Sequence, residues 1–171
     1  MYTWREINQS NWQFDHVGLI VRDLDRTLEY FQNLGLVSAF RETPKAPQGS
    51  PRPSATTAYT TLPGGEIWNI ADVGSAKGGL KGRSFKMGSL AIEMIKPGEG
   101  VWDCNTEFLH SKGEGISHVC FYVDDLEVET AKLVEKGIPI VMTVTIENRD
   151  IMHYFDIHRF GGILLELLQK R

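Results

Sequence analysis

The strongest constraint on this chain is an internal repeat. The segment beginning at Asp15 reads DHVGLIVRDL, and the segment 102 positions later (118 − 16) reads SHVCFYVDDL. Six identities fall in one register without a gap, and a histidine, an aspartate and a glycine are among them. The chain is therefore expected to contain two copies of one structural unit. The identical pairs are His16 and His118, Val17 and Val119, Val21 and Val123, Asp23 and Asp125, Leu24 and Leu126, and Gly35 and Gly137.

Each copy predicts a strand followed by a helix. Apolar residues alternate from Val17 to Val21, which indicates a strand with one face covered by a helix. Asp23 suits the N-cap of that helix, and Gly35 suits its left-handed C-cap. The second copy repeats these signals. Short β-rich segments then follow, over 36–42 and 138–146.

The copies also end alike, in apolar strands that each carry one carboxylate. Glu93 lies 73 positions (166 − 93) before Glu166, so the first copy holds 29 extra residues (102 − 73). The Pro/Gly/Ser/Thr-rich stretch 44–82 accommodates them as a long loop, which could contain a hairpin through 56–61 and 67–72. Each module is therefore expected to be βαβββ. The predicted divisions are an N-terminal extension 1–13, a first module 14–96, a linker 97–115 and a second module 116–171.

The alternation of the strands decides where the two histidines point. His16 shares its strand face with Gly18, and His118 shares its face with Cys120. The opposite face of each strand is aliphatic or aromatic and belongs to the helix. Each histidine is therefore expected to project away from the helix, beside a small neighbour that leaves room for it.

Two histidines and two carboxylates, one pair per repeat, are typical of a divalent-metal site. Glu93 and Glu166 lie in otherwise apolar strands, where a carboxylate is costly unless it is paired, protonated or metal-bound. With His16 and His118 they suit Co, Zn, Ni, Mn or Fe, and Mg less well. A single such histidine is usually structural, and a single such Glu could face solvent at an edge. Because both recur at matched positions, four metal ligands are favoured over a degenerate site that has lost its metal.

Other charged or polar residues are weaker candidates. His153 and His158 could line a cavity, although surface placement is expected, and His110 is expected to be solvated in a helix over 105–112. Three basic residues alternate on the strand before Gly88 and could meet an anionic substrate tail, although a solvated edge is the commoner explanation. These three are Lys81, Arg83 and Lys86.

The composition excludes several classes of protein. The net charge is −4, without a basic run interleaved with aromatic residues, so a nucleic-acid partner is not expected. No window approaches the run of about 18 apolar residues that spans a bilayer. The start of the chain is polar, so a signal peptide is not expected, and with two cysteines a disulfide framework is not expected either. The prediction is a cytoplasmic protein without a membrane partner.

At these residues the chain resembles the vicinal-oxygen-chelate superfamily, which includes glyoxalase I, methylmalonyl-CoA epimerase, extradiol dioxygenases and bleomycin-resistance proteins. DHVGLIVRDLDRTLEYFQNLGL is similar to the first strand and helix of the epimerase and its glyoxalase-like relatives. IEMIKP resembles their fourth strand, FLHSKGEGISHVCFYVDDLE their linker and fifth strand, and GGILLELLQ their last strand. The resemblance covers nearly all of 14–169 apart from the insertion 44–82.

The resemblance implies a fold and a chemistry. The expected α+β fold has two βαβββ modules that form a curved mixed β-sheet around a metal site. The implied ligands of one divalent ion are His16, Glu93, His118 and Glu166, and Glu166 is implied to be catalytic as a proton-transfer group. The reaction is proton abstraction next to a carbonyl, with the enediolate held on the metal. The epimerase's second base, a Glu on the strand before that of Glu93, has no counterpart in 80–87.

Several functions follow from this resemblance. A methylmalonyl-CoA epimerase-like isomerase acting on an acyl-CoA thioester is favoured, and a glyoxalase I-like lactoylglutathione lyase acting on a thiol hemithioacetal is the alternative. An extradiol dioxygenase ranks lower because a fourth protein ligand at Glu93 would crowd the positions that oxygen and catechol need. A non-catalytic binding protein of the bleomycin-resistance type generally lacks the ligand set. Exposed strand edges and the segment 4–12 could support a homodimer.

Overall fold

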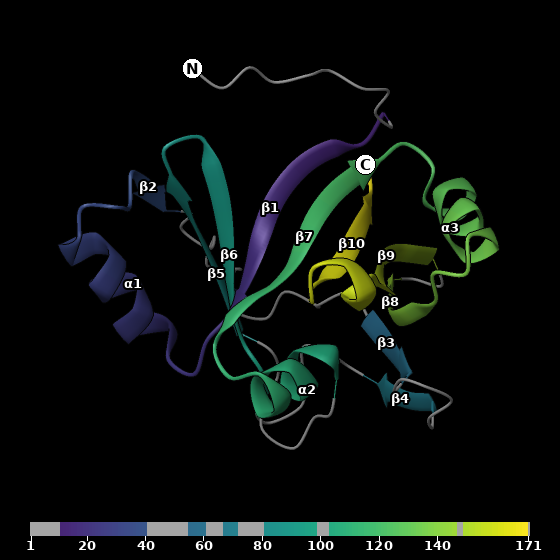
Figure 1. Ribbon diagram of the computed structural model, residues 1–171, viewed down its shortest axis with the longest axis horizontal. Helices are drawn as coiled ribbons and strands as arrows, with labels where there is room; N and C mark the ends of the chain where they lie inside the picture. Colours follow the sequence, from purple (N-terminus) through teal and green to yellow (C-terminus); the bar gives the residue numbers. More distant parts are fainter. Residues whose placement is uncertain are drawn as a thin grey trace, which may run out of the picture.

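The protein is an α+β fold built on one mixed sheet, as a computed structural model shows (Figure 1). The structure describes residues 11–40, 55–60, 67–71, 81–98, 103–146 and 149–170; the rest of the predicted extension, insertion and linker lies outside them. The elements are β1 (Gln13–Ile20), α1 (Leu24–Asn33), β2 (Ala39–Phe40), β3 (Ala55–Thr60), β4 (Ile67–Ala71), β5 (Lys81–Met87), β6 (Leu90–Lys96), α2 (Cys104–Ser111), β7 (Gly115–Val123), α3 (Leu126–Glu135), β8 (Ile140–Ile146), β9 (Arg149–Asp156), a 3-10 turn (His158–Phe160) and β10 (Leu164–Gln169).

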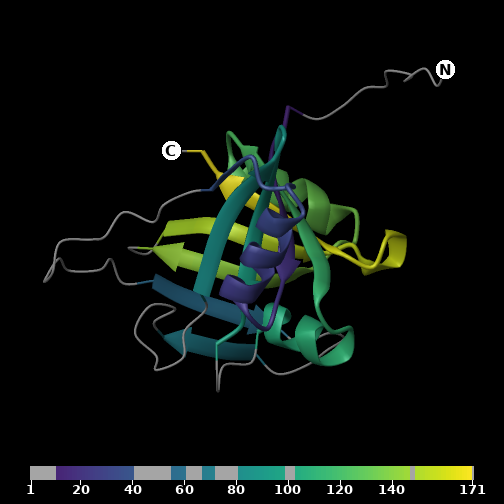
Figure 2. The same cartoon turned by 90° about the vertical axis from the view of Figure 1, so that its left-hand side faces the viewer.

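The sheet has approximate twofold symmetry about its two central strands. Its order is β2-β5-β6-β1-β7-β10-β9-β8-β3-β4, with β1 antiparallel to β7. β6 runs parallel to β1 on one side, and β10 runs parallel to β7 on the other. α1 and α3 flank the sheet at opposite sides (Figure 1), and its curvature sets β5 and β6 across the direction of β8 and β9 (Figure 2). The predicted pairing of two βαβββ units in a curved mixed sheet is confirmed, whereas the exact module boundaries stay predictions.

The predicted hairpin in the insertion is present, but the strand of the sheet with which it pairs was not predicted. β3 and β4 are antiparallel partners, with Ala58 opposite Asn69. β3 also pairs with β8, where Ala58 lies opposite Thr143. The insertion of the first repeat therefore extends the half of the sheet that belongs to the second repeat.

The two helices that follow the repeated strands begin as predicted. The Asp23 carboxylate accepts a hydrogen bond from the Arg26 backbone N–H at 3.0 Å, and the Asp125 carboxylate accepts one from Val128 at 3.0 Å. Each satisfies a backbone donor that the first helical turn leaves without a partner. Gly35 (φ 70°) and Gly137 (φ 77°) occupy the left-handed positions that end these helices.

The predicted helix-facing residues form two similar cores. In the first unit, Val17 and Leu19 pack with Leu24, Leu28 and Phe31 of α1. In the second unit, the equivalent strand residues pack against α3. These are Val119, Phe121 and Val123, with Leu126 and Leu133 of the helix. Since this face of β1 and β7 is filled, the residues that alternate with it project from the other face. No helix in the described parts of the chain is long and apolar enough to cross a membrane.

We expect Asp125→Ala to lower the free energy of unfolding by about 1 kcal/mol, because the first turn of α3 then loses its side-chain acceptor. Asp23→Ala is expected to have a similar effect on α1. Urea unfolding followed by far-UV circular dichroism measures both changes. Glu135→Ala, an exposed substitution in the last turn of α3, is the control and should change stability by less than about 0.5 kcal/mol. Equal stability of Asp125→Ala and the control would contradict the capping role.

Candidate metal centre

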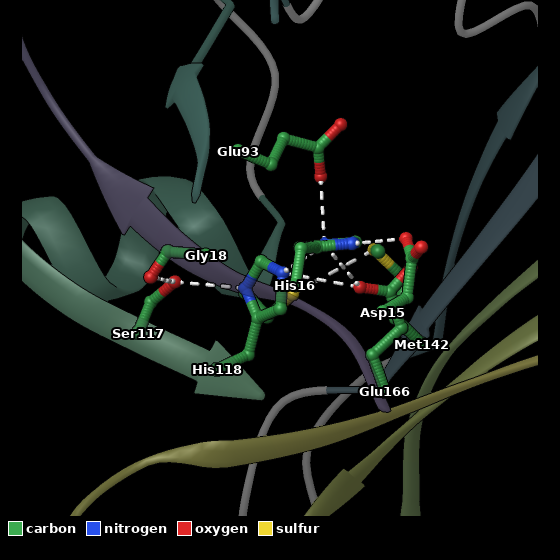
Figure 3. Close-up of polar contacts among 9 residues, drawn as sticks. Asp15, His16, Gly18, Glu93, Ser117, His118, Met142 and Glu166 are labelled. Atoms are coloured by element: carbon green, nitrogen blue, oxygen red, sulfur yellow. Dashed lines mark hydrogen bonds and ion pairs between the residues drawn. The ribbon is translucent and has the colours of Figure 1, made fainter. Parts of the chain in front are cut away.

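Four neighbouring strands bring the predicted ligands together. β6, β1, β7 and β10 are adjacent in the sheet and carry Glu93, His16, His118 and Glu166 respectively. One ligand atom from each side chain lies within 4.8 Å of those of the other three. The four side chains point toward one another from the face opposite α1 and α3 (Figure 3). The strand alternation seen in the sequence therefore indicated the correct face for both histidines.

The spacing of the donor atoms suits one ion at their centre. His16 Nε2 lies 3.1 Å from Glu93 Oε2, 3.4 Å from Glu166 Oε2 and 3.3 Å from His118 Nε2. His118 Nε2 lies 3.1 Å from Glu166 Oε2. Two atoms that bind one ion at about 2.1 Å, at an angle of about 90–110°, are about 3.0–3.4 Å apart. The cluster of His and Glu residues could therefore hold a metal ion.

Hydrogen bonds to the other ring nitrogens leave both Nε2 atoms available. His16 Nδ1 lies 2.8 Å from Asp15 Oδ2, and His118 Nδ1 lies 2.9 Å from Ser117 Oγ. The Ser117 hydroxyl is placed to donate to the Gly18 carbonyl at 3.5 Å, so it can accept from His118 Nδ1–H. Metal-binding histidines are commonly oriented by such partners. These two residues were not predicted from the sequence, although Asp15 and Ser117 precede the histidines at matched positions of the repeat.

One carboxylate oxygen of Glu166 is buried without a hydrogen-bond donor. The Glu166 side chain is 3% exposed, and Oε2 is the one buried side-chain polar atom in the described ranges without a hydrogen-bond partner. Both histidine Nε2 atoms are near it, but neither contact has hydrogen-bond geometry. Short distances without a donated hydrogen bond do not compensate for the burial of a carboxylate oxygen. An orphaned carboxylate oxygen facing two imidazoles is what a metal ion would satisfy.

The two histidines keep the Glu166 carboxylate charged. Burial acts to raise the pKa of Glu166, but His118 and His16 lower it further, to about 2. For His16, burial lowers the pKa, whereas contacts with Cys120, Glu166 and Glu93 outweigh burial and raise the pKa far above its usual range. Without an ion, a proton on His16 therefore partly balances the two carboxylates. A divalent cation would take over that role and displace the proton.

Gly18 provides the space that His118 occupies. Gly18 lies opposite His118 in the β1–β7 pairing, and a Cβ built on Gly18 would lie 1.8 Å from His118 Cε1. His16 lies opposite Cys120 in the same way. The sequence analysis placed a small neighbour beside each histidine on its own strand. In the structure, each small residue faces the histidine of the other repeat, which follows from the antiparallel pairing.

The expectation for His153 was wrong, whereas Arg83 and Lys86 are exposed to solvent as expected. Arg83 Nη1 lies 2.6 Å from Asp25 Oδ1 of α1. The Lys81 side chain lies outside the described part of the structure. His153, expected at the surface, is 6% exposed and lies 2.8 Å from Thr130 Oγ1 of α3, so it belongs to the helix side of the sheet.

The remaining histidines lie outside the cluster. His110 is exposed in α2, as expected. His158 Nδ1 lies 2.6 Å from Asp156 Oδ1. His158 also lines a cavity of about 240 Å³ beside α2, to which none of the four clustered residues contributes.

Tyr154 and Met142 form a wall of the centre that the sequence analysis missed. Tyr154 lies opposite both Glu166 and Met142 in the sheet pairing, and its ring centroid is 5.1 Å from that of His118. Burial raises the pKa of Tyr154 well above its usual range, so its hydroxyl stays protonated. Met142 packs in one core cluster with Tyr154. These side chains restrict water on this side of the centre, which strengthens electrostatic interactions within it.

Comparison with known proteins supports the fold. The family described as the glyoxalase/bleomycin resistance protein/dioxygenase superfamily matches residues 15–155. A hypothetical protein from Bacillus halodurans superposes with a TM-score of 0.57 at 18% identity, covering 95% of this chain and 96% of that chain. Methylmalonyl-CoA epimerase from Mycobacterium tuberculosis gives a TM-score of 0.56 at 18% identity, covering 97% and 93%.

A third solved structure resembles the chain to a similar extent. A Streptomyces coelicolor methylmalonyl-CoA epimerase variant, in complex with 2-nitronate-propionyl-CoA, gives a TM-score of 0.53 at 16% identity and covers 92% of this chain and 96% of that chain. At such identities the likeness shows the fold. No curated protein matches the chain.

Proposed function

The chain belongs to the glyoxalase/bleomycin resistance protein/dioxygenase superfamily, and from this premise we propose that it is a divalent-metal-dependent isomerase or lyase. The proposed reaction is removal of a proton next to a carbonyl. The single observation that carries the proposal is the Glu166 carboxylate, which is buried with one oxygen unsatisfied between two histidines. A structural carboxylate in such a place would be expected to have hydrogen-bond donors.

His16, Glu93, His118 and Glu166 are the proposed ligands of one ion of Co, Zn, Ni, Mn or Fe, with Mg less suitable. When bound, such an ion supplies Lewis acidity that polarises a substrate carbonyl and makes the neighbouring C–H more acidic. Asp15 and Ser117 hold the two imidazoles in the orientation that directs Nε2 into the centre. Asp15 belongs to the first repeat and Ser117 to the second, so each repeat orients its own histidine.

Glu166 is the proposed proton-transfer group. Its carboxylate is ionised, because His118 and His16 lower its pKa to about 2 against the effect of burial. Little water reaches it, since its side chain is 3% exposed and Tyr154 lies opposite on β9. In the proposed reaction a Glu166 oxygen accepts the substrate α-proton. Delivery of a proton from water to the opposite face of the same carbon is epimerisation, and return of the proton by Glu166 to the neighbouring carbon is isomerisation of the glyoxalase type.

The favoured substrate is a branched acyl-CoA thioester such as methylmalonyl-CoA. The likeness of the linker and the IEMIKP strand to the epimerase supports this choice, and epimerase structures are among the solved structures with this fold. The second candidate is a thiol hemithioacetal. It is supported by β5, where Ser84 lies opposite Glu93 and the strand carries no carboxylate for a second base. A single carboxylate is sufficient for transfer between neighbouring carbons.

The other two classes fit this centre less well. Glu93 Oε2 lies 3.1 Å from His16 Nε2, so the centre has a fourth donor where a dioxygenase would need open positions. A non-catalytic binding protein would have no use for a buried carboxylate oxygen without a hydrogen-bond donor, such as Glu166 Oε2, because it transfers no proton. A homodimer and a cytoplasmic location stay predictions.

Deuterium exchange tests the proposed proton transfer. Protein reconstituted with Co²⁺ or Mn²⁺ is expected to exchange the α-proton of methylmalonyl-CoA with D₂O, as followed by NMR. Glu166→Gln is expected to lower the exchange rate by at least about 100-fold, because the amide cannot accept the proton. Glu135→Gln, exposed on α3, is the matched control and should exchange like the unaltered protein.

The outcomes separate the candidate functions. Exchange into methylmalonyl-CoA supports the epimerase, and turnover restricted to methylglyoxal–thiol adducts supports the lyase. Bound metal without proton exchange in either substrate class would overturn the proposed chemistry. Failure to bind any of the candidate metals would favour a binding protein.

A further inference from the structure

The two repeats surround their histidines with different chemistry. Asp15 and Ser117 are equivalent positions, as are Gly18 and Cys120, because each pair is separated by 102 residues (117 − 15 and 120 − 18). In the antiparallel β1–β7 pairing, each histidine faces the small residue of the other repeat. His118 therefore has a hydroxyl and a glycine beside it. His16 has a carboxylate and a thiol.

The groups around His16 are close enough to act together. The ligand atoms of Asp15, His16 and Cys120 lie within 4.8 Å of one another. Cys120 is completely buried, and it lies directly opposite Glu166 in the β7–β10 pairing, so the two share a face of the sheet. The unsatisfied Oε2 of Glu166 thus lies on the face that carries this thiol, and it adds negative charge near any cation held there.

We propose that Asp15, His16 and Cys120 form a second metal-ligand set, which takes a thiophilic divalent ion such as Cd²⁺ or Zn²⁺. A thiolate, an imidazole and a carboxylate together favour softer ions over the hard ions that carboxylates alone prefer. The ion meets His16 through Nδ1, since that nitrogen lies 2.8 Å from Asp15 Oδ2, whereas Nε2 faces Glu93, His118 and Glu166. The set goes beyond the proposed function and does not require it.

Binding at this set has a defined proton balance. The S–H bond of Cys120 is replaced by an S–metal bond, and the thiol proton leaves to solvent. The Nδ1 proton of His16 is lost in the same way, which removes the hydrogen bond that Asp15 makes to the ring. Since that bond orients His16 in the four-ligand centre, thiophilic ions are expected to inhibit the enzyme at this position.

Titration of the reduced protein with Cd²⁺ tests the proposal through the near-ultraviolet thiolate-to-metal charge-transfer band. The band is expected in the unaltered protein and in Cys104→Ser, which removes the other free thiol. That thiol belongs to Cys104, which is not one of the three proposed ligands and lies 3.7 Å from Met142 Sδ. Cys120→Ser is expected to lose the band and to weaken Cd²⁺ binding about tenfold or more. A band that persists in Cys120→Ser, or no band in the unaltered protein, would overturn the proposal.

Glu93→Gln distinguishes this set from the four-ligand centre. The substitution removes one donor of that centre and none of the Asp15–His16–Cys120 set, so the Cd²⁺ band is expected to remain. Its loss in Glu93→Gln would assign Cys120 to the four-ligand centre and contradict a separate set. The Cd²⁺ band and proton exchange are independent measurements. If the protein exchanges no proton with any substrate, the proposed function fails, but the band is still expected.

Discussion

His118→Ala is expected to abolish metal binding and turnover together. His118 is completely buried, and its Nε2 lies 3.1 Å from Glu166 Oε2 and 3.3 Å from His16 Nε2. Removing the imidazole takes away one donor and leaves the buried Glu166 carboxylate with a single histidine. The metal affinity should fall by more than about 100-fold, which is the upper range for loss of an outer-shell partner alone. Elemental analysis after reconstitution and gel filtration measures the metal content.

His110→Ala is the control for this prediction, because it makes the same chemical change at an exposed position of α2. It should retain both metal and activity. His118→Asn is a second variant, which keeps a polar side chain if the alanine variant does not fold. Circular dichroism establishes that each variant is folded. Unchanged metal content in a folded His118 variant would refute the assignment of this residue as a ligand.

Gly18→Ala is expected to disrupt the centre although Gly18 has no side chain to contribute. Its added Cβ would lie 1.8 Å from Cε1 of His118 and 2.2 Å from both ring nitrogens. The imidazole cannot move freely, since it is completely buried, its Nδ1 lies 2.9 Å from Ser117 Oγ, and the Tyr154 ring packs against it. The free energy of unfolding should therefore fall by about 1–3 kcal/mol. Metal affinity should fall by about 100-fold, because Nε2 is displaced.

Gly82→Ala provides a matched control in the same sheet. A Cβ on Gly82 would lie 3.6 Å from the Met94 carbonyl oxygen and 3.7 Å from Glu93 Oε1, which are ordinary contact distances. This variant should bind metal like the unaltered protein, although it also replaces a strand glycine by alanine. Equal metal affinity in Gly18→Ala and Gly82→Ala would show that His118 does not depend on the space at Gly18.

The repeat made much of the fold and the centre predictable. The match of His16 with His118 and of Glu93 with Glu166 identified four residues that the structure brings together, from parts of the chain up to 150 residues apart (166 − 16). Strand alternation gave the face of the two histidines correctly, because the period of two residues is a property of the backbone itself. The helix caps at Asp23 and Asp125 were equally local signals.

What could not be predicted depends on contacts between distant strands. The register of β1 against β7 decides that Gly18 faces His118, and no local pattern specifies that register. Pairing of the inserted strand β3 with β8 is a similar long-range choice. The ion pair of Arg83 with Asp25 was not predicted, because it joins β5 to a helix that is distant in the sequence. The burial of His153 likewise depends on Thr130 of α3.

The central claim is that one divalent ion binds between the two repeats, and the metal content of the unaltered protein tests it most directly. The purified chain would be stripped with a chelator, reconstituted separately with Co²⁺, Zn²⁺, Ni²⁺, Mn²⁺ and Fe²⁺, freed of excess metal and subjected to elemental analysis. The structure predicts about one tightly held ion per chain for at least one of these metals, and Cys120→Ser, which leaves only the four-ligand centre, should retain it as the unaltered protein does. Retention of no ion under any of these conditions would contradict the claim.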